Sequence, residues 1–257
     1  MVQTVFNRYE KKYLLTRDVY LKLREKLQER MVVDQYGEHT ICNIYYDTKN
    51  YDLIRKSIEK PVYKEKIRLR SYGVPSLDST VYLEIKKKYQ KVVNKRRIAI
   101  KLSDAYNLIE KAEQPLEDSQ ILNEIKYFLK HYKLVNKTFL AYDRIALYDK
   151  EDHDFRITFD HNIRSRNYDT ELEKGDYGKY LLDENYYLME TKIYSSTPLW
   201  FTEILSELKI YPTSFSKYGN IYKNKYHQFN VDNLMNHYIE NWDNLGGQNV
   251  KQYISQL

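Results

Sequence analysis

The sequence predicts an α+β protein built around a barrel or large antiparallel sheet, and three observations support this fold class. Many segments alternate apolar and polar residues with the period of a strand, and few helical segments lie between them. Glycine (7) and proline (5) are both scarce, so no break in composition marks a domain boundary. Charged residues recur on one face of most of these strands, which favours a closed barrel with a polar, cationic lumen and helices packed outside.

The alternation that predicts strands is clearest in a series of segments distributed along the chain. Successive side chains of a strand point to opposite faces, so each segment has one apolar and one polar face. The predicted strands are 8–15, 39–48, 63–72, 80–88, 91–101, 139–148, 155–164 and 186–193.

Helical periodicity and helix-start signals predict the remaining elements. A helix at 16–31 has Thr16 as N-cap, with Val19, Leu23 and Leu27 on one face. Further helices are predicted at 103–112, at 118–132 from an Asp118 cap, and after Thr197, where Thr197 is the N-cap and Pro198 the first helical residue. A last helix is predicted at 231–242. We therefore expect one domain over 1–230 and a helical tail over 231–257.

Composition limits the class of protein and its partners. With 42% hydrophobic and 30% charged residues, the 257-residue chain is typical of a soluble globular protein. The net charge of +6 favours polyanionic partners without choosing among nucleic acid, anionic lipid and phosphate compounds. The single cysteine, Cys42, excludes an intrachain disulfide and is expected in the core. No signal-peptide pattern and no bilayer-length apolar run is found, so we expect a cytoplasmic protein with no membrane span.

The stretch "KIRLRSYG" places Lys66, Arg68 and Arg70 on one face of a strand and apolar residues on the other. For a single strand, a solvated face is the simpler explanation. The pattern recurs, however, and it mixes acidic with basic residues. The other charged faces carry Arg8, Glu10 and Lys12; Glu84, Lys86 and Lys88; Lys95 and Arg97; Arg144; Arg156 and Asp160; and Glu190 and Lys192.

A lumen lined in this way suits a phosphate compound. The guanidinium of arginine presents a planar fork of donors to phosphate oxygens, and lysine adds a point charge. Carboxylates among these cations are explained as ligands of Mg²⁺ or Mn²⁺, which prefer oxygen and bridge phosphates. An RNA-binding patch over the lysine-rich stretch 86–97 is the alternative, and it predicts scattered surface charge rather than convergence. We expect Tyr45, Tyr46, Tyr186 and Tyr187 to pack rather than to stack on bases, which disfavours nucleic acid as a partner.

An ordered series of motifs resembles one known superfamily. These motifs are "RYEKKYLL", "NIYYDT", "KIRLRSYG", "YLEIKKK", "VNKRRIAI", "AYDRIAL", "FRITFD", "METKI" and "FSKYGN". Over about residues 6–222 the chain resembles the triphosphate tunnel metalloenzymes, and within them the catalytic domain of the vacuolar transporter chaperone (VTC) polyphosphate polymerases. The resemblance implies an eight-stranded antiparallel tunnel. Where the superfamily has Glu-x-Glu-x-Lys, this chain has Arg8 in place of the first glutamate, as in the polymerase branch.

The resemblance also implies roles for individual residues. It implies a polymerase that transfers the γ-phosphate of ATP to polyphosphate, with Mn²⁺ or Mg²⁺ as cofactor and inorganic phosphate or pyrophosphate as further ligands. The phosphate-binding residues would be Lys12, Arg68, Arg70, Lys86, Lys95, Arg97, Arg144, Arg156, Lys192, Ser214, Ser216 and Lys217. The catalytic group would be Lys12, Arg68, Arg70, Lys86, Arg144, Arg156 and Glu190, and the metal ligands Glu190, Glu84, Glu10 and Asp160.

Two other functions stay open at this point. A hydrolase of inorganic triphosphate or of a nucleoside triphosphate would use the same cations, although a hydrolase usually needs a residue that orients or deprotonates water. The six histidines are scattered and none stands out for that task, which favours the polymerase. A non-catalytic module that binds polyphosphate or RNA is the third possibility.

Overall fold

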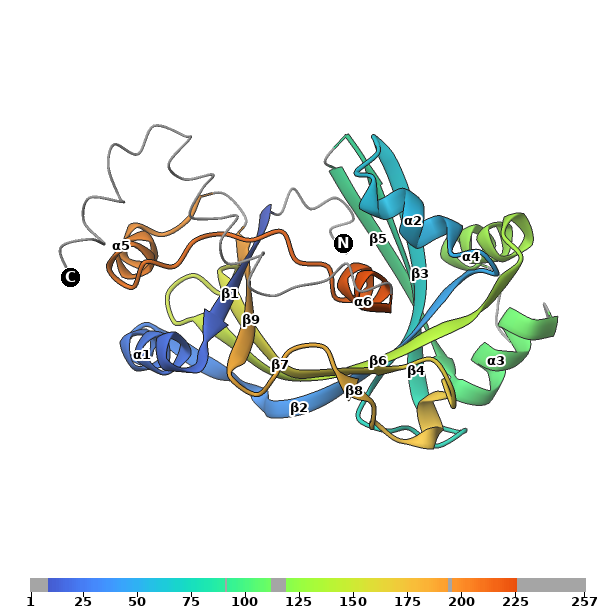
Figure 1. The fold of residues 1–257 in the computed structure, drawn as a ribbon, viewed down its shortest axis with the longest axis horizontal. Coiled ribbons are helices and arrows are strands. Elements are labelled where there is room, and N and C mark those ends of the chain that lie inside the picture. Colours follow the sequence, from blue (N-terminus) through green and yellow to red (C-terminus); the bar gives the residue numbers. More distant parts are fainter. Residues whose placement is uncertain (1–8, 91, 112–118, 194–195, 226–257) are drawn as a thin grey trace.

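The dominant feature of the computed structural model is a nine-stranded antiparallel sheet that curls around one concave face (Figure 1). The structure describes residues 9–90, 92–111, 119–193 and 196–225. Several predictions therefore lie outside the described residues: the positions of Arg8 and Asp118, the start of the strand predicted at 91, and the whole helix predicted at 231–242.

The strands follow one another in the sheet in the order β1-β9-β7-β6-β2-β3-β4-β5, with the short β8 attached to β7. Their bounds are β1 Tyr9–Thr16, β2 Met31–Thr48, β3 Tyr63–Tyr72, β4 Thr80–Tyr89, β5 Val92–Lys101, β6 Leu134–Asp149, β7 Arg156–Arg166, β8 Lys179–Tyr180 and β9 Tyr186–Ile193. All eight predicted strands are present. No pairing joins the edge strands β1 and β5 in the described part of the chain, so the structure shows a curled sheet rather than the closed barrel that the sequence predicts.

Strands β2 and β6 are longer than predicted and form the floor of the concave face (Figure 1). The register of their pairing shifts between Val33 and Glu38, and Gly37 in this bulge has a φ of 58°. A bulge bends a strand and increases its twist, and glycine adopts positive φ without the steric cost of a Cβ. The sequence places a helix as far as 31, but residue Met31 already begins β2.

Six α-helices and one short 3₁₀ helix are found in the described residues. They are α1 Arg17–Leu27, α2 Asp52–Ile58, α3 Leu102–Lys111, α4 Gln120–His131, η1 Leu172–Lys174, α5 Leu199–Glu207 and α6 Lys217–Lys225. Thr16 caps α1 as predicted, because its hydroxyl accepts from the amide of Val19 at 3.5 Å. None of the described helices is long and apolar enough to span a membrane.

Two predicted helix starts are wrong by one residue. Helix α4 is capped by Ser119, whose hydroxyl accepts from the amide of Leu122 at 3.2 Å, rather than by the preceding aspartate. Helix α5 begins at Leu199 with Pro198 at the cap position and no side-chain cap, so Thr197 is not the N-cap. Ser119 is a preferred N-cap residue, whereas α5 begins without a side-chain cap.

Apolar side chains pack mainly on the outer face of the sheet, beneath the helices. Helices α3 and α4 cover β3, β4 and β5, where Ile67 and Leu83 are fully buried and Cys42 lies in the core as expected. Helices α1 and α5 cover β1, β7 and β9 around Phe159. Helix α6 lies on the concave side instead (Figure 1), where Tyr218 packs with residues of β2 and β6. The concave face is therefore left for polar residues, with α6 filling part of it.

Candidate functional site

Charged side chains from β1, β9, β7, β6, β3, β4 and β5 lie on the concave face, and β2 contributes the polar side chains of Asn43 and Tyr45. The register places Lys12 opposite Glu190 and Arg68 opposite Glu84, and directly opposite residues point to the same face. Across the concavity, the Nζ of Lys86 on β4 lies 3.5 Å from a carboxylate oxygen of Glu10 on β1, although these strands are not neighbours in the sheet. This contact shows that the sheet curls far enough for side chains of β1 and β4 to meet across the concavity.

The first cluster on this face surrounds Glu84. Its carboxylate accepts from Arg68 Nε at 2.7 Å and lies 2.7 Å from Lys95 Nζ and 3.8 Å from Arg70 Nε. Burial alone would raise the pKa of Glu84, but Arg68, Arg70 and Lys95 outweigh it and hold this pKa well below its usual range. Glu84 is therefore a permanent anion that fixes the two arginines in position.

The second cluster surrounds Asp160, which is completely buried. Arg144 donates to it through Nε at 2.5 Å and through Nη2 at 2.8 Å, and the ammonium of Lys217 contacts the same carboxylate. These two cations outweigh the effect of burial and lower the pKa of Asp160. Helix α6 thus contributes its first residue to the concave face.

The third cluster contains Glu190 and is the most loosely paired. Lys12 Nζ lies 3.8 Å from its carboxylate and donates instead to the carbonyl of Phe215 at 2.8 Å. Burial would raise the pKa of Glu190, but Lys12, Lys217 and Arg144 outweigh it and lower it to about 2. Glu190 is therefore ionised, and no described cation lies closer to its carboxylate than Lys12.

These carboxylates fit a metal ion only in part. No group of three or more histidine, cysteine, aspartate or glutamate residues among the described residues could enclose an ion. Glu190, with Glu10 diagonally across the β1–β9 ladder, could supply one or two carboxylate ligands. Mg²⁺ is commonly held in this way, with substrate phosphates and water completing its coordination. Glu84 and Asp160 are each bound by cations of the protein, so they are less suited to the ligand role that the resemblance implies.

Three residues of the site were not assigned a role from the sequence. The hydroxyl of Tyr45 accepts from Arg68 Nη1 at 3.1 Å, and that of Tyr142 accepts from Arg70 Nη2 at 3.2 Å. Burial would raise the pKa of Tyr45, but Arg68 and Lys66 lower it to about 7. Burial together with Lys86 and Arg68 lowers the pKa of Lys66 to about 8. The sequence does contain a signal for Lys66, because this residue shares the charged strand face of "KIRLRSYG" with Arg68 and Arg70.

The remaining predicted residues lie at the border of this face or beside it. Arg97 lies over the ring of Tyr82, and Arg156 is exposed and donates to the carbonyl of His153. Lys192 lies next to Glu190 on the inner face of β9, and Lys95 lies opposite Lys86. Ser214 and Ser216 precede α6, and the hydroxyl of Ser216 accepts from the amide of Gly219 at 3.2 Å.

Lysine and arginine residues that alternate with the site residues point to the other face. Lys87 and Arg96 lie 3.6 and 2.8 Å from the carboxylate of Glu124 on α4. The basic stretch 86–97 is therefore divided between an inner cationic face and ion pairs with an outer helix. This convergence is what the enzyme hypothesis predicts and what a scattered RNA-binding patch does not.

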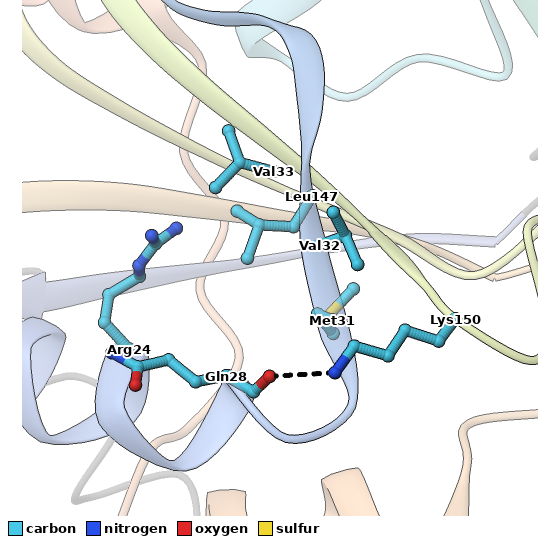
Figure 2. Close-up of a pocket in the computed structure, with 7 residues that line it drawn as sticks. All are labelled: Arg24, Gln28, Met31, Val32, Val33, Leu147 and Lys150. Carbon is cyan, nitrogen blue, oxygen red and sulfur yellow. Dashed lines mark hydrogen bonds between the residues drawn. The ribbon is translucent and has the colours of Figure 1, made fainter.

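An outer pocket of about 280 Å³ lies apart from this site, between α1 and the ends of β2 and β6 (Figure 2). Its floor is apolar, with Met31 and Leu147, and Lys150 donates to the carbonyls of Gln28 and Glu29 at 3.2 and 2.7 Å. Lysine at the C-terminus of a helix satisfies carbonyls that have no partner within the helix. The pocket therefore includes a helix-capping contact and takes no part in the charged face.

A family model confirms the resemblance drawn from the motifs. The model described as "VTC domain" matches residues 7–226. The chain belongs to the VTC domain family. This VTC domain is part of the CYTH-like triphosphate tunnel metalloenzyme superfamily, whose fold is that of phosphate-handling enzymes. The division into a domain over 1–230 and a helical tail over 231–257 stays a prediction. The search with this chain found no significant match among curated proteins.

Solved structures agree with this fold. A candidate adenylate cyclase from Bacillus halodurans is 15% identical to the VTC domain chain, with a TM-score of 0.54 over 83% of this chain and 96% of that one. A candidate adenylyl cyclase from Hippeastrum, whose structure revealed a dominant triphosphatase activity, is 14% identical, with a TM-score of 0.52 over 86% and 97% of the two chains. At these identities the likeness establishes the fold and not the reaction.

Proposed function

We propose that this VTC domain is a metal-dependent polyphosphate polymerase that transfers the γ-phosphate of ATP to a growing polyphosphate chain. The observation that supports it most is the convergence of cations from separate strands on one concave face, where they outnumber the carboxylates. Lysine residues lie directly opposite each other at Lys66 and Lys86, and like charges so placed destabilise a sheet unless something negative lies between them. A linear polyanion is such a ligand.

In the proposed reaction, a terminal phosphate oxygen of the chain or of inorganic phosphate attacks the γ-phosphorus of ATP. The new P–O bond forms as the bond between the γ-phosphorus and the β–γ bridging oxygen breaks, and ADP leaves with the electron pair. The attacking oxygen is already ionised, so no general base is required. Phosphoryl transfer depends mostly on positioning and on neutralising charge, which Lys12, Arg68, Arg70 and Arg144 are placed to provide.

Glu190, with Glu10 beside it, would hold the divalent ion, which would supply neutralisation of phosphate charge. Lys12 and Lys217 lie near Glu190 and would bind phosphate oxygens. Glu84 would keep Arg68 and Arg70 in a fixed orientation, so that their unused donors face the ligand. Each of these roles is assigned to residues that already lie close to one another in the structure.

Hydrolysis of inorganic or nucleoside triphosphate is the second candidate function. It is favoured by one observation, the triphosphatase activity named for the Hippeastrum protein of the same fold. Binding of polyphosphate without turnover is a third outcome that the same cationic face would allow.

One incubation separates the three functions. The protein is mixed with ATP and Mn²⁺, and the products are separated on a gel and assayed for free phosphate. A ladder of acid-labile polymer supports the polymerase. Free phosphate without polymer supports the hydrolase, and tight binding of polyphosphate without either product supports the binding module. The absence of polymer under saturating ATP and metal would refute our proposal.

A further inference from the structure

A row of four aromatic rings lies at one end of the concave face. The ring centroids of Tyr36 and His39 are 6.2 Å apart, those of His39 and Tyr72 5.9 Å, and those of Tyr72 and Tyr82 5.8 Å. The rings come from β2, β3 and β4, which are neighbours in the sheet. Tyr36 lies within the bulge of β2, where Gly37 allows the chain to turn.

These rings are not part of the apolar core. Tyr72 is 52% exposed and Tyr36 is 69% exposed. The guanidinium of Arg97 lies 4.7 Å from the centre of the Tyr82 ring and covers its face, while Tyr82 meets Tyr72 edge to face at 80°. Tyr82 therefore supports the Tyr72 ring on one side, while much of Tyr72 stays exposed to solvent. Such a ring offers a flat surface to another planar group.

The row adjoins the cationic face directly. Tyr82 lies opposite Arg70 in the β3–β4 ladder, and His39 lies opposite Arg144 in the β2–β6 ladder. Tyr72 follows Arg70 by two residues on the same face of β3, which is a separation of about 7 Å along the strand. A ligand whose phosphates bind Arg70 and Arg144 would thus have Tyr72 within reach of its other end.

We propose that Tyr72, supported by Tyr82 and His39, is a stacking platform for the nucleobase of a nucleoside triphosphate bound by the cationic face. The position of the phosphates rests on the proposed function, whereas the platform rests on the aromatic row itself. A nucleoside triphosphate is the ligand class that joins a flat aromatic ring to a polyanion. Since stacking uses the flat face that every base has, the platform is tolerant of base identity, and ATP and GTP bind with similar affinity.

Calorimetric titration of Tyr72→Ala with ATP and with inorganic triphosphate tests the platform, because only ATP has a base. Loss of one stacked base weakens ATP binding by about tenfold. Affinity for inorganic triphosphate stays within about twofold, since the cations are untouched. Tyr72→Phe keeps a flat ring and keeps ATP affinity. Tyr127→Ala is the matched control, since Tyr127 is likewise exposed, at 69%, and stacks on a histidine, His131, but lies on α4.

The proposal is overturned if Tyr72→Ala binds ATP as tightly as the unchanged protein. It is also overturned if both ligands weaken equally, because the substitution then acts on the cationic face and not on a base. A protein that binds ATP in this Tyr72-dependent way but makes no polymer confirms the platform and refutes only the polymerase. A protein that binds no nucleotide refutes the platform.

Discussion

At the scale of single residues, the carboxylates of the concave face differ in how completely they are paired. Glu84 is 2% exposed and contacts three cations, whereas Lys12 is the one cation of the described residues within 4 Å of Glu190. A buried anion with close cationic partners stabilises their arrangement, and its removal leaves like charges facing one another. A loosely paired carboxylate is free to bind an ion. We therefore expect glutamate to have two different roles on this face, a structural one at Glu84 and metal binding at Glu190.

This difference predicts opposite outcomes for two substitutions. Glu190→Gln should lower metal-dependent turnover by about a hundredfold or more, because the ion supplies several kcal/mol of charge stabilisation. Its melting temperature should fall less than that of Glu84→Gln, because Lys12 is the one cation within 4 Å of Glu190 among the described residues. Glu84→Gln should instead lower the melting temperature, because Arg68, Arg70 and Lys95 lose their shared anion. Turnover assays with Mn²⁺ and thermal denaturation measure both, and full activity in Glu190→Gln would remove this residue from the metal site.

Arg68 has a structural role as a partner of Glu84 and a proposed role in ligand binding, and the two can be separated. Arg68→Ala should weaken nucleotide binding, and it should destabilise the fold by about 3 kcal/mol or more, as expected when one partner of a buried ion pair is lost. Adding Glu84→Gln should cost less stability in this background than in the unchanged protein, because Glu84 has already lost one of its three cations, and it should restore none of the affinity. Chemical denaturation and nucleotide titration of both variants give the comparison. Unchanged nucleotide affinity in Arg68→Ala would exclude Arg68 from the site.

Tyr45 should titrate near neutral pH. Because its pKa is lowered to about 7 in the folded protein, its contribution to stability is absent below that pH. The contribution grows as the pH rises from about 7 to the ordinary value for tyrosine, about 10. The ultraviolet absorbance of tyrosinate should show a transition near pH 7 that Tyr45→Phe abolishes. Bound inorganic triphosphate should move the transition to higher pH, since its charge offsets that of Arg68 and Lys66.

At the scale of elements, the sequence predicts the strands better than the helices. Strand alternation is strong because one face is charged and the other packs under helices. Helix α2 was not predicted because its cap is remote: Asp47, at the end of β2, accepts from the amides of Leu53 and Ile54 at 2.9 and 3.0 Å. Helix α6 was not predicted because it contains Gly219 and has weak periodicity, and tertiary packing of Tyr218 overrides these preferences.

Helix α6 should couple stability to phosphate binding, because it carries Lys217 to Asp160. Ile221→Ala removes an apolar contact beneath α6 and should cost about 2–5 kcal/mol of unfolding free energy. Phosphate affinity should fall with it. Ser119→Ala is the control, since loss of this cap on the outer helix α4 should cost about 1 kcal/mol and leave phosphate affinity unchanged. Equal phosphate affinities in both variants would show that α6 does not position the site.

At the scale of the whole molecule, the sequence predicts which residues share a face but not how they pair. Alternation in "KIRLRSYG" and "YLEIKKK" places Arg68 and Glu84 on the charged faces of their strands. The register of β3 and β4 then brings them together as an ion pair. The spacing of a motif carries no information about the partner across the sheet. For the same reason the contact of Tyr45 with Arg68 became visible only in three dimensions.

The collected charge of the concave face predicts how the whole protein responds to anions. Cations held close together repel one another, so a ligand that binds between them stabilises only the folded chain. At one hundred times its dissociation constant, inorganic triphosphate should add about 2.7 kcal/mol, which for a chain of this size raises the melting temperature by about 5–10 °C. Sodium chloride should raise the melting temperature less, because salt only weakly screens the repulsion between partly buried charges. Sulfate at matched ionic strength separates screening from specific binding, and a melting temperature indifferent to triphosphate would show that these cations do not form one site.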